Sequence, residues 1–432
     1  MIVCKFGGSS VADASQIKKV KAILESDKNR EIAIVSAPGK RNKDDEKITD
    51  LLYECNRLVQ QGQSCRPLFA KIQKRFMGIA EELKLNTSEL EDALDEVRRN
   101  IDAGRGADYA ASRGEYLSAR LISQALGWEF LDSERVIVIN NDSTVNPQSY
   151  ENLSEYIKKG KHYVIPGFYG KSEQGEVKTF TRGGSDITGA IVARATSADV
   201  YENWTDVSGV KRADPRVVEY ASVIDTMSYE EVRELSEVGA SVFHEEAIAP
   251  VVPMGIPINI KNTNKPEDRG TFIVPEATGT GLCGVSAKGG LSAIRLSKLM
   301  LFKKRGMRHA LLTMLQVYGI RPCYSIFGID SLTWYFDSKM ASDSVVESMC
   351  ERLKSEFMLD SVTVERGYAI MGVVGENMDK STEFVDALVA LKNAKIDILS
   401  VSYGMSSVST LIGIKEEDKN RAVKAVYDAL FK

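Results

Sequence analysis

The residues best suited to chemistry come first in the chain, where MIVCKFGGSS places Lys5 and four small residues, Gly7, Gly8, Ser9 and Ser10, around the end of an apolar segment. The apolar residues predict a buried strand that the glycines end, and Ser9 or Ser10 can cap the helix that the following apolar spacing indicates. Such junctions bind anions, because free backbone amides and the positive helix end point into the loop. We therefore expect a phosphate site at Lys5, with a tight turn and a surface lysine as the alternative.

A second group of reactive side chains lies in TFTRGGSDITGAIVARA. Arg182 precedes two glycines, and Ser185 and Asp186 lead an apolar helix. Arginine offers a planar clamp for a carboxylate, the glycines leave amides free, and the aspartate can receive an ammonium group or orient a metal. Serine or aspartate at a helix start is also an ordinary N-cap. Few structural needs require all of these residues at once, so the combination favours a binding site.

Two more segments carry polar residues near expected helix starts. ASRGEYLSARL places Glu115 where a helix enters the core, and a buried carboxylate needs a partner. That partner is either a substrate ammonium group or an internal arginine such as Arg113. VSAPGKRNKDDEKITDLL places small residues after a predicted strand, and Thr49 opens the next helix. A charged surface loop explains this second segment equally well.

Two later loops complete the set. ENWTDVSGVKRADPR has Thr205 and Asp206 at a strand end, and INIKNTNKPEDRGT offers Lys261 and Asn262 in a loop able to lie across phosphates. A polar double turn and ordinary surface lysines explain the same residues without a ligand. Two lysines beside a glycine loop, with an aspartate, an arginine and a glutamate, suit phosphoryl transfer to a small acidic amine. The sequence contains no GxxxxGK[ST] segment and no HRD or DFG set, which argues against P-loop and protein-kinase chemistry.

Composition limits the partners. The chain has 432 residues, 43% hydrophobic and 27% charged, with a formal net charge of -4, so electrostatics favours neither nucleic acid nor an anionic membrane. Six scattered cysteines and three histidines match no zinc spacing, and no apolar run reaches the roughly 20 residues of a membrane span. The N-terminus enters a strand without a leader segment. We expect a cytoplasmic protein with reduced, mostly buried thiols and neither a nucleic-acid nor a membrane partner.

Short apolar segments alternate with amphipathic helical ones through residue 285. The candidate strands are 2–6, 32–36, 136–140, 162–166, 200–204 and 256–260. Alternation predicts an open, largely parallel sheet sandwiched by helices. Ligands of such sheets bind beyond the carboxyl ends of the strands, where the glycines cluster. Residues 1–285 are therefore expected to form the catalytic domain.

The pattern changes after PEATGTGLCG, where closely spaced strand pairs are separated by single helices. IRPCYSIFGIDSLTWYF can be laid over IDILSVSYGMSSVSTLI with a constant offset of 76 residues, which matches Ile320 with Ile396, Gly328 with Gly404 and Ser331 with Ser407. A repeat built as strand, helix, strand, strand, helix, strand is a ferredoxin-like α+β unit. Residues 286–432 are expected to contain two interleaved copies, with two unrelated segments aligned by chance as the alternative.

The segments KFGGSSV, VSAPGK, RGEYLSA, PGFYG, RGGSD, WTDVSGV and ADPR, in this order, resemble the aspartate kinase (aspartokinase) family over essentially the whole chain. The resemblance implies an α/β amino-acid-kinase domain followed by two ACT domains, which are the ferredoxin-like pair. It also implies ATP-dependent phosphorylation of L-aspartate to 4-phospho-L-aspartate, the entry to lysine, threonine and methionine biosynthesis. The end at Lys432 leaves no room for the homoserine dehydrogenase fused to some relatives, so a monofunctional enzyme is expected.

The resemblance assigns roles to matching positions. The implied catalytic residues are Lys5, Gly8 and Asp186. Aspartate would be bound by Thr49, Glu115, Arg182 and Ser185, with Glu115 receiving its ammonium group and Arg182 its α-carboxylate. ATP would be bound by Lys5, Gly7, Gly8, Ser9, Thr205, Asp206, Lys211, Arg216, Lys261 and Asn262. Two departures from the family pattern concern the nucleotide: Lys211 stands where relatives have tyrosine, and the alignment of the 261–265 loop is ambiguous by one residue.

The resemblance further implies ATP and Mg²⁺, with the ion held chiefly by ATP oxygens rather than by the protein. The ACT pair implies feedback inhibition by an end-product amino acid, most often lysine in monofunctional members, in a homodimer or a dimer of dimers joined through ACT domains. The candidate effector residues are Met307, His309, Ser325, Asp330 and Ser331, which could also be a helix start and a turn. The competing interpretations are a related kinase, such as glutamate 5-kinase or acetylglutamate kinase, and an amino-acid sensor without turnover.

Overall fold

The computed structural model describes residues 1–432 apart from 181–182, 241–242, 244, 278–280, 304 and 405. The chain forms two compact units, each described here by itself. The first unit comprises Met1–Val210, Val223–Ser236 and Ser241–Thr278, and the second comprises Lys211–Ser222, Glu237–Ala240 and Gly279–Lys432.

The first unit is built on an eight-stranded sheet with the order β3-β4-β2-β1-β7-β9-β10-β8. Its strands are β1 (Ile2–Phe6), β2 (Arg30–Val35), β3 (Glu129–Phe130), β4 (Tyr163–Pro166), β7 (Val200–Thr205), β8 (Thr226–Ser228), β9 (Ile258–Asn262) and β10 (Thr271–Val274). Every neighbouring pair runs parallel except β9 and β10. The predicted largely parallel sheet is therefore confirmed.

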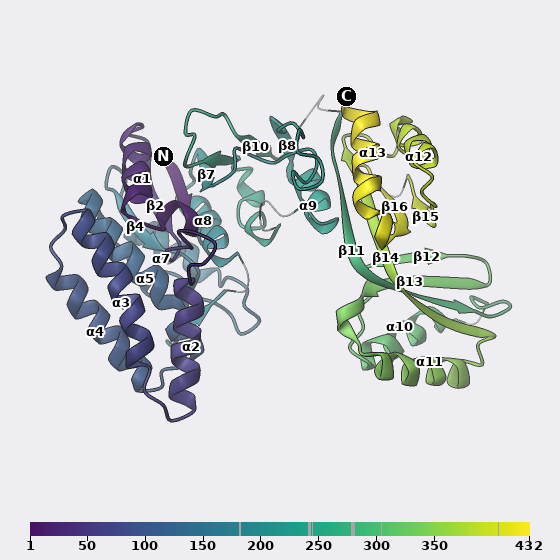
Figure 1. The fold of residues 1–432 in the computed structure, drawn as a ribbon, viewed down its shortest axis with the longest axis horizontal. Coiled ribbons are helices and arrows are strands. Elements are labelled where there is room, and N and C mark those ends of the chain that lie inside the picture. Colours follow the sequence, from purple (N-terminus) through teal and green to yellow (C-terminus); the bar gives the residue numbers. More distant parts are fainter. Residues whose placement is uncertain (181–182, 241–242, 244, 278–280, 304, 405) are drawn as a thin grey trace. The chain divides into compact units, whose positions relative to one another are not determined.

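Helices cover both faces of this sheet. One core contains Cys4 and Phe6 of β1 together with apolar residues of five helices, several of which stand side by side in Figure 1. These helices are α1 (Ala14–Glu25), α2 (Ile48–Gln60), α3 (Arg66–Glu82), α4 (Ser88–Asp102) and α5 (Ala107–Leu126). Because strand side chains alternate, Lys5 points to the opposite face, where α8 packs on β1 and β7. The other elements of this unit are η1 (Gly8–Val11), α6 (Ser133–Val136), α7 (Gln148–Tyr156), β5 (Tyr169–Lys171), β6 (Val177–Thr179), α8 (Gly184–Ala195), α9 (Tyr229–Glu237), η2 (Glu245–Ala247) and η3 (Val252–Met254), with the last residue of α9 belonging to the second unit.

The predicted cap of the first helix is wrong. Ser9 and Ser10 lie in the short 3-10 helix η1, and α1 begins only at Ala14. Its N-cap is Asp13, whose side chain accepts a hydrogen bond from the Gln16 amide at 2.9 Å. Neither serine therefore caps α1, and both lie in the segment between β1 and α1.

The strand predicted over 136–140 is also wrong. Residues up to Val136 form α6, and Val138 and Ile139 make isolated bridges to Lys171 and Val145 outside the main sheet. All four apolar residues of 136–139 are buried. Their burial explains a strand-like sequence in a segment that packs against the core without joining the sheet.

The second unit is built on a six-stranded antiparallel sheet with the order β12-β13-β11-β14-β16-β15. Its strands are β11 (Leu282–Ser297), β12 (Tyr324–Phe327), β13 (Ser331–Asp337), β14 (Ser361–Gly375), β15 (Ser400–Ser402) and β16 (Ser409–Lys415), and its short 3-10 helices are η4 (Ser338–Met340) and η5 (Glu416–Asp418). The two long central strands each serve both halves of the sheet. Register shifts between them lie near Gly290 and Gly367, whose φ angles of 74° and 81° favour glycine.

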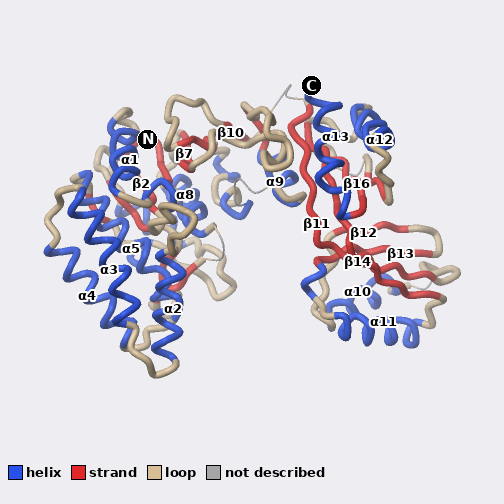
Figure 2. The backbone as a smooth tube through the Cα atoms, in the orientation of Figure 1, coloured by secondary structure: helices blue, strands red, loops and turns tan. Residues whose placement is uncertain are grey.

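Each half of this sheet has its own pair of helices, as Figure 2 shows. Each half also has its own hydrophobic core. The pairs are α10 (Met307–Val317) with α11 (Asp343–Phe357), and α12 (Glu383–Asn393) with α13 (Lys419–Phe431). The 76-residue repeat is visible at matched helix ends: the Ile320 amide donates to the Leu315 carbonyl and the Ile396 amide to the Leu391 carbonyl, both at 3.0 Å. The two ferredoxin-like copies are confirmed.

The segment Lys211–Ser222 follows β7 in sequence but packs in the second unit. Ala213, Val218 and Ala221 are buried in the core that contains α12 and α13. The boundary expected at residue 285 falls inside β11 and stays a prediction.

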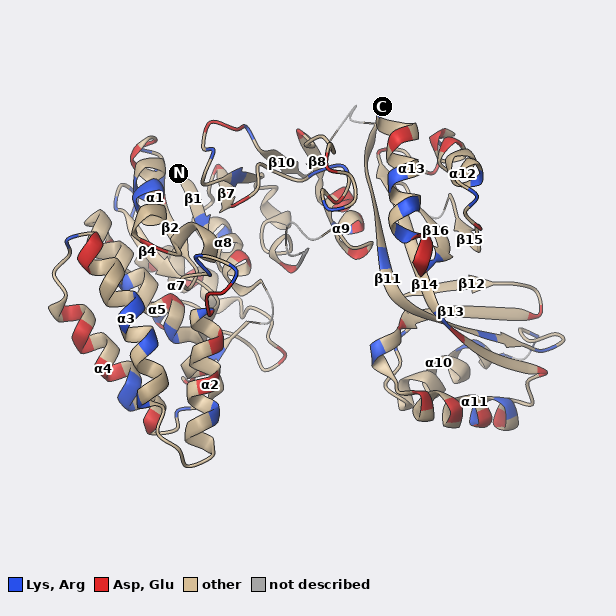
Figure 3. Cartoon of the chain, in the orientation of Figure 1, with Lys and Arg blue, Asp and Glu red and all other residues tan. Residues whose placement is uncertain are grey.

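Among the described residues, no helix is long and apolar enough to cross a membrane. All six cysteines are free thiols and four of them are buried, as expected. Figure 3 shows acidic and basic residues mixed along helices such as α11 and α13.

Candidate active site

The predicted ligand edge lies at the carboxyl ends of the parallel strands. β1, β2, β4, β7 and β9 end at Phe6, Val35, Pro166, Thr205 and Asn262. The loops that follow are tied together by backbone hydrogen bonds, from Gly7 to Trp204 (3.0 Å), Ser36 to Phe6 (3.1 Å), Gly167 to Val35 (3.0 Å) and Thr263 to Thr205 (2.8 Å). Most residues that the sequence predicts for the site therefore gather at one edge of the sheet.

Lys5 and Asp186 form an ion pair at this edge, with 2.6 Å between Nζ and Oδ1. Lys5 comes from β1, and Asp186 comes from the first turn of α8, where Gly183 has a φ of 73° that favours glycine. The two side chains are only 10% and 17% exposed. Burial strengthens the pair and fixes its geometry, since little solvent screens the two charges.

Two glycine loops touch beside Lys5. The Gly39 amide donates to the Gly8 carbonyl at 2.8 Å, and a Cβ atom on Gly39 would lie 2.7 Å from the Gly8 carbonyl carbon. A Cβ atom on Gly7 would lie 3.6 Å from the Lys5 Nζ. Only glycine at position 39 permits this approach, because a side chain there would collide with the backbone of the first loop.

Glu115 of α5 is 6% exposed, and among the described residues its Oε2 has no hydrogen-bond partner. Burial raises the pKa of Glu115 to about 8, opposed by a hydrogen bond from the Ala37 backbone and weakly by the charge of Arg113. The guanidinium of Arg113 instead lies against the rings of Tyr109, Tyr116 and Tyr169, with its carbon 4.6 to 4.9 Å from their centroids. The internal arginine therefore does not satisfy this carboxyl group, and a ligand cation could.

The other substrate candidates have mixed positions. Ser185 lies in the first turn of α8, and a Cβ atom on Gly167 would come 2.6 Å from its Oγ, so the loop after β4 touches it. Thr49 is the second residue of α2, whose first residue, Ile48, packs toward Gly114 beside Glu115. Arg182 lies outside the described residues, and its role stays a prediction.

The nucleotide candidates separate into two groups. Thr205 ends β7 and Asp206 follows it, and β9 places Lys261 beside Trp204 with Nζ 5.2 Å from the ring centroid. Burial lowers the pKa of Lys261. Asn262 is buried and donates from Nδ2 to Ser208 Oγ at 2.9 Å.

Lys211 and Arg216 form the second group, because both belong to the segment that packs in the second unit. The side chain of Arg216 is 84% exposed and pairs with Asp214 at 2.6 Å. The structure therefore does not join these two residues to the cluster around Lys5, and their nucleotide role stays a prediction.

Sequence reasoning missed three residues of the site. Arg75 of α3 is buried and donates to the backbone carbonyls of Ala12 (2.9 Å) and Gly39 (3.5 Å), so it links the end of η1 to the second glycine loop. Asn203 and Tyr201 of β7 both hydrogen-bond to Asp186. The available signal for Asn203 was a polar residue inside an otherwise buried strand.

The effector candidates all lie in the half of the second unit that contains α10 and α11. Met307 is the buried first residue of α10, and His309 is exposed two residues later. Ser325 and Ser331 lie on β12 and β13. Asp330 accepts a hydrogen bond from the Met300 amide at 2.7 Å through Oδ1.

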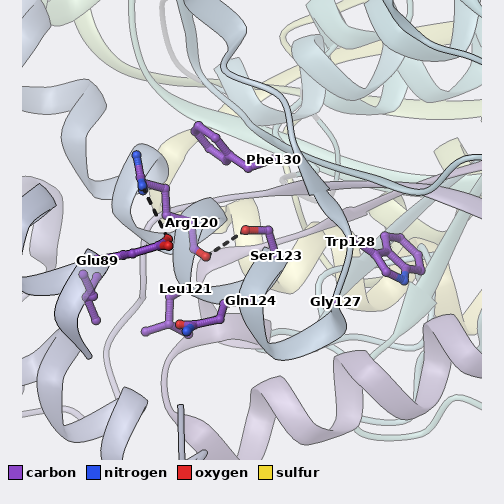
Figure 4. A pocket seen from close by; sticks show the side chains of 9 residues that line it. Glu89, Arg120, Leu121, Ser123, Gln124, Gly127, Trp128 and Phe130 are labelled. Carbon is purple, nitrogen blue, oxygen red and sulfur yellow. Dashed lines mark hydrogen bonds and ion pairs between the residues drawn. The ribbon is translucent and has the colours of Figure 1, made fainter. Parts of the chain in front are cut away.

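A cavity of about 380 Å³ lies in the first unit between α4, α5 and β3. Figure 4 shows Arg120 directed toward Glu89, with 3.9 Å between the charged groups, and near Phe130. None of the predicted site residues lines this cavity. It is separate from the Lys5 cluster.

Comparisons with known proteins agree with this arrangement. The Amino acid kinase family matches residues 1–262, and an ACT domain family matches residues 371–430. Aspartokinase 3 of Bacillus subtilis (strain 168) is 35% identical over 448 residues, which cover 100% of this chain and 99% of that protein. The chain belongs to the aspartate kinase family. Its enzymatic class is therefore aspartate kinase, and the competing kinases and the non-catalytic sensor are not supported.

Solved structures of aspartate kinases have the same fold. The Clostridium acetobutylicum aspartate kinase is 40% identical with a TM-score of 0.92, and each chain is covered completely. Aspartokinase III of E. coli is 24% identical, with TM-scores of 0.81 for its complex with aspartate and ADP (R-state) and 0.78 for its complex with lysine and aspartate (T-state), again over 100% of both chains. The expected kinase domain followed by two ACT domains is confirmed.

Proposed function

We propose that this aspartate kinase transfers the γ-phosphoryl group of ATP to the side-chain carboxylate of L-aspartate, with the Lys5–Asp186 pair at the centre of the reaction. The buried ion pair beside the two touching glycine loops is the observation that carries this proposal. The E. coli enzyme crystallised with aspartate and ADP supports the choice of substrates. Lys5, Gly7, Gly8 and Ser9 would contact the phosphates, and Glu115 and Ser185 would hold aspartate.

The reaction requires charge neutralisation rather than a general base. A carboxylate oxygen of aspartate forms a bond to the γ-phosphorus, and the bond from that phosphorus to the β,γ-bridging oxygen breaks and releases ADP. The nucleophile is already an anion, so the main obstacle is repulsion between it and the triphosphate. The Lys5 ammonium and the loop amides would neutralise that charge, and Glu115 would fix the aspartate ammonium so that the reacting atoms stay aligned.

Magnesium would enter with ATP. Among the described residues, no group of three or more His, Cys, Asp or Glu side chains is arranged to hold a metal ion. We propose that the ion would be held mainly by phosphate and water oxygens. Bound in this way, Mg²⁺ would neutralise part of the triphosphate charge. Lys5 would then neutralise charge on the oxygens of the transferring phosphoryl group.

The reaction is tested by incubating the full chain with ATP, Mg²⁺ and single amino acids, and trapping acyl phosphate as hydroxamate. We expect hydroxamate with L-aspartate and little with L-glutamate, because one more methylene group puts the carboxylate out of line with the γ-phosphorus while the ammonium group stays on Glu115. Hydroxamate from glutamate alone, or none from any acid, would contradict the proposal.

We further propose feedback inhibition by lysine, acting through the second unit. An E. coli relative carries the name lysine-sensitive aspartokinase 3, which supports the choice of effector. Lysine must favour an inactive arrangement through contacts that differ between two states. Ala213 and Val218 tie the Lys211–Ser222 segment to the core of this unit, so a change of packing there would move Lys211 and Arg216, the proposed nucleotide contacts.

A subunit contact through the ACT domains is proposed as well. The strand β12 lies at an edge of its sheet, and Phe327 and Ile329, on this strand and the turn after it, are 50% and 89% exposed. Exposed apolar residues on an unpaired edge are typical of an interface. We propose that the chain forms a homodimer or a dimer of dimers through this edge.

We also propose that residues 286–432 form the regulatory region. The enzyme would act in lysine, threonine and methionine biosynthesis in the cytoplasm, where free thiols stay reduced.

Asp330→Asn tests the effector site. The amide keeps an acceptor for the Met300 backbone but removes the charge that would attract the lysine ammonium, so half-inhibition should require about tenfold more lysine. The matched control is Asp337→Asn, since Asp337 accepts a backbone hydrogen bond from Lys339 at 2.9 Å in the same way. Equal lysine sensitivity of both variants and the parent would remove Asp330 from the site.

A further inference from the structure

Asn203 lies between the two charged groups of the site. It is the register partner of Lys5 across the parallel pair β1 and β7, so both side chains emerge on the same face of the sheet. Its Nδ2 donates to Asp186 Oδ1 at 2.8 Å, and its Oδ1 accepts from Lys5 Nζ at 3.5 Å. Asn203 is 4% exposed, so water does not replace it readily.

The chemistry of the three groups fixes the orientation of this amide. A carboxylate only accepts hydrogen bonds and an ammonium group only donates them. The Nδ2 must therefore face Asp186 and the Oδ1 must face Lys5. The reverse orientation would place donor against donor and acceptor against acceptor.

The same strand also holds the backbone of Asp186. Tyr201, two residues before Asn203 and on the same face, donates from its hydroxyl to the Asp186 carbonyl oxygen at 3.1 Å. A Cβ atom on Gly189 would lie 2.5 Å from that hydroxyl, so glycine at this position lets α8 approach the strand. The strand β7 thus fixes both the backbone and the side chain of Asp186.

We propose that Asn203 is a positioning residue that keeps Asp186 in place while Lys5 turns from it to the transferring phosphoryl group. This inference rests on the proposed function. Without Asn203, the departure of Lys5 would leave the buried carboxylate of Asp186 without that side-chain donor, which costs free energy. That cost would oppose the movement of Lys5 toward the phosphoryl group. The neutral amide of Asn203 leaves Asp186 with one donor throughout, and it adds no charge that would compete with the phosphate for Lys5.

Asn203→Leu removes both hydrogen bonds and keeps the number and branching of the side-chain heavy atoms. We expect kcat to fall about tenfold while KM for aspartate and for ATP changes less than about twofold, because the loss affects the Lys5 movement rather than ground-state binding. The matched control is Asn259→Leu, a buried asparagine (5% exposed) on the neighbouring strand β9, and it should leave kcat within about twofold. Thermal unfolding of both variants shows whether either effect is one of stability.

Asn203→Asp provides a second measurement, the pH dependence of kcat, which would not change if Asn203 only supported the fold. The introduced carboxyl group has the same size, but at high pH it repels Asp186 and competes for Lys5. When protonated, it can donate to Asp186 as the amide does. We therefore expect the ratio of its kcat to that of the parent to rise as the pH is lowered from 8 to 6.

The outcomes separate the inference from the function beneath it. If the parent does not phosphorylate aspartate, the proposed function fails. If the parent is active but Asn203→Leu matches Asn259→Leu, or if the Asn203→Asp ratio stays constant with pH, the positioning role is wrong. Should Asn203→Leu not fold, the Asn203→Asp profile alone decides.

Discussion

Replacing Lys5 with alanine is expected to lower kcat for aspartate phosphorylation by at least about 100-fold, which corresponds to about 2.7 kcal/mol of lost transition-state stabilisation. Lys5 is the cation beside the glycine loop, and its partner Asp186 holds it at 2.6 Å. Without it, the charge that spreads over the transferring phosphoryl group meets backbone amides alone. Initial rates at saturating ATP and aspartate give the measurement.

Two further variants control for other effects of that change. Lys5→Arg keeps the charge but replaces a compact ammonium group with a planar fork, so it should recover only part of the activity. Lys21→Ala removes a half-buried lysine of α1 whose Nζ lies 3.8 Å from Glu25 and donates to the Ala125 carbonyl at 3.2 Å, and it should leave kcat unchanged. A kcat for Lys5→Ala within about threefold of the parent would take the phosphate-neutralising role away from Lys5.

Glu115 gives the second large effect, which appears in KM rather than in kcat. Glu115→Gln keeps the size of the side chain but removes the charge proposed to bind the aspartate ammonium group, so KM for aspartate should rise about 10- to 100-fold with kcat changed much less. KM for ATP should stay near that of the parent. An unchanged aspartate KM would contradict the ammonium assignment.

The pKa of Glu115 makes this prediction dependent on pH. Burial raises that pKa from 4.5 to about 8, so at neutral pH the ligand-free carboxyl group is protonated and must lose its proton to pair with ammonium. KM for aspartate in the parent should therefore rise by as much as about 50-fold between pH 8 and pH 6, the limit if only the ionised form binds. The Glu115→Gln variant should show no such slope.

The same group links stability to pH. Because its pKa is higher in the folded than in the unfolded chain, the folded protein binds the additional proton between about pH 4.5 and 8. The stabilisation from this proton is fully present below pH 4.5 and is lost as the pH rises through 8. Thermal unfolding without aspartate should thus show that Glu115→Gln becomes more stable relative to the parent as the pH rises across this range. Parallel curves would place the pKa elsewhere.

The architecture could be predicted from the sequence because its signals are local and repeated. Alternating apolar segments and helices predicted the parallel sheet, and the constant offset between Ile320 and Ile396 predicted the two halves of the second unit. The failures have physical reasons. The segment 136–140 is buried and apolar without being a strand of the sheet, and Asp13 replaces Ser9 as the cap because η1 intervenes before α1.

Lys5, Asp186 and Glu115 could be predicted as site residues from the sequence, because at each of these positions a single charged side chain indicates the chemistry. Contacts between distant segments could not be read from the sequence. Nothing local in VYENW indicates that Asn203 faces Lys5, since that depends on the register of β7 against β1. The packing of Lys211–Ser222 in the second unit also depends on partners far along the chain.

The most direct test of the central claim is a crystal structure of the full chain with aspartate, Mg²⁺ and a non-hydrolysable ATP analogue. The terminal phosphate should lie within about 3 Å of the Lys5 ammonium group and of amides in the Gly7–Ser9 loop, with the aspartate ammonium group at Glu115. A triphosphate bound away from the end of β1, with Lys5 still paired only to Asp186, would contradict the account.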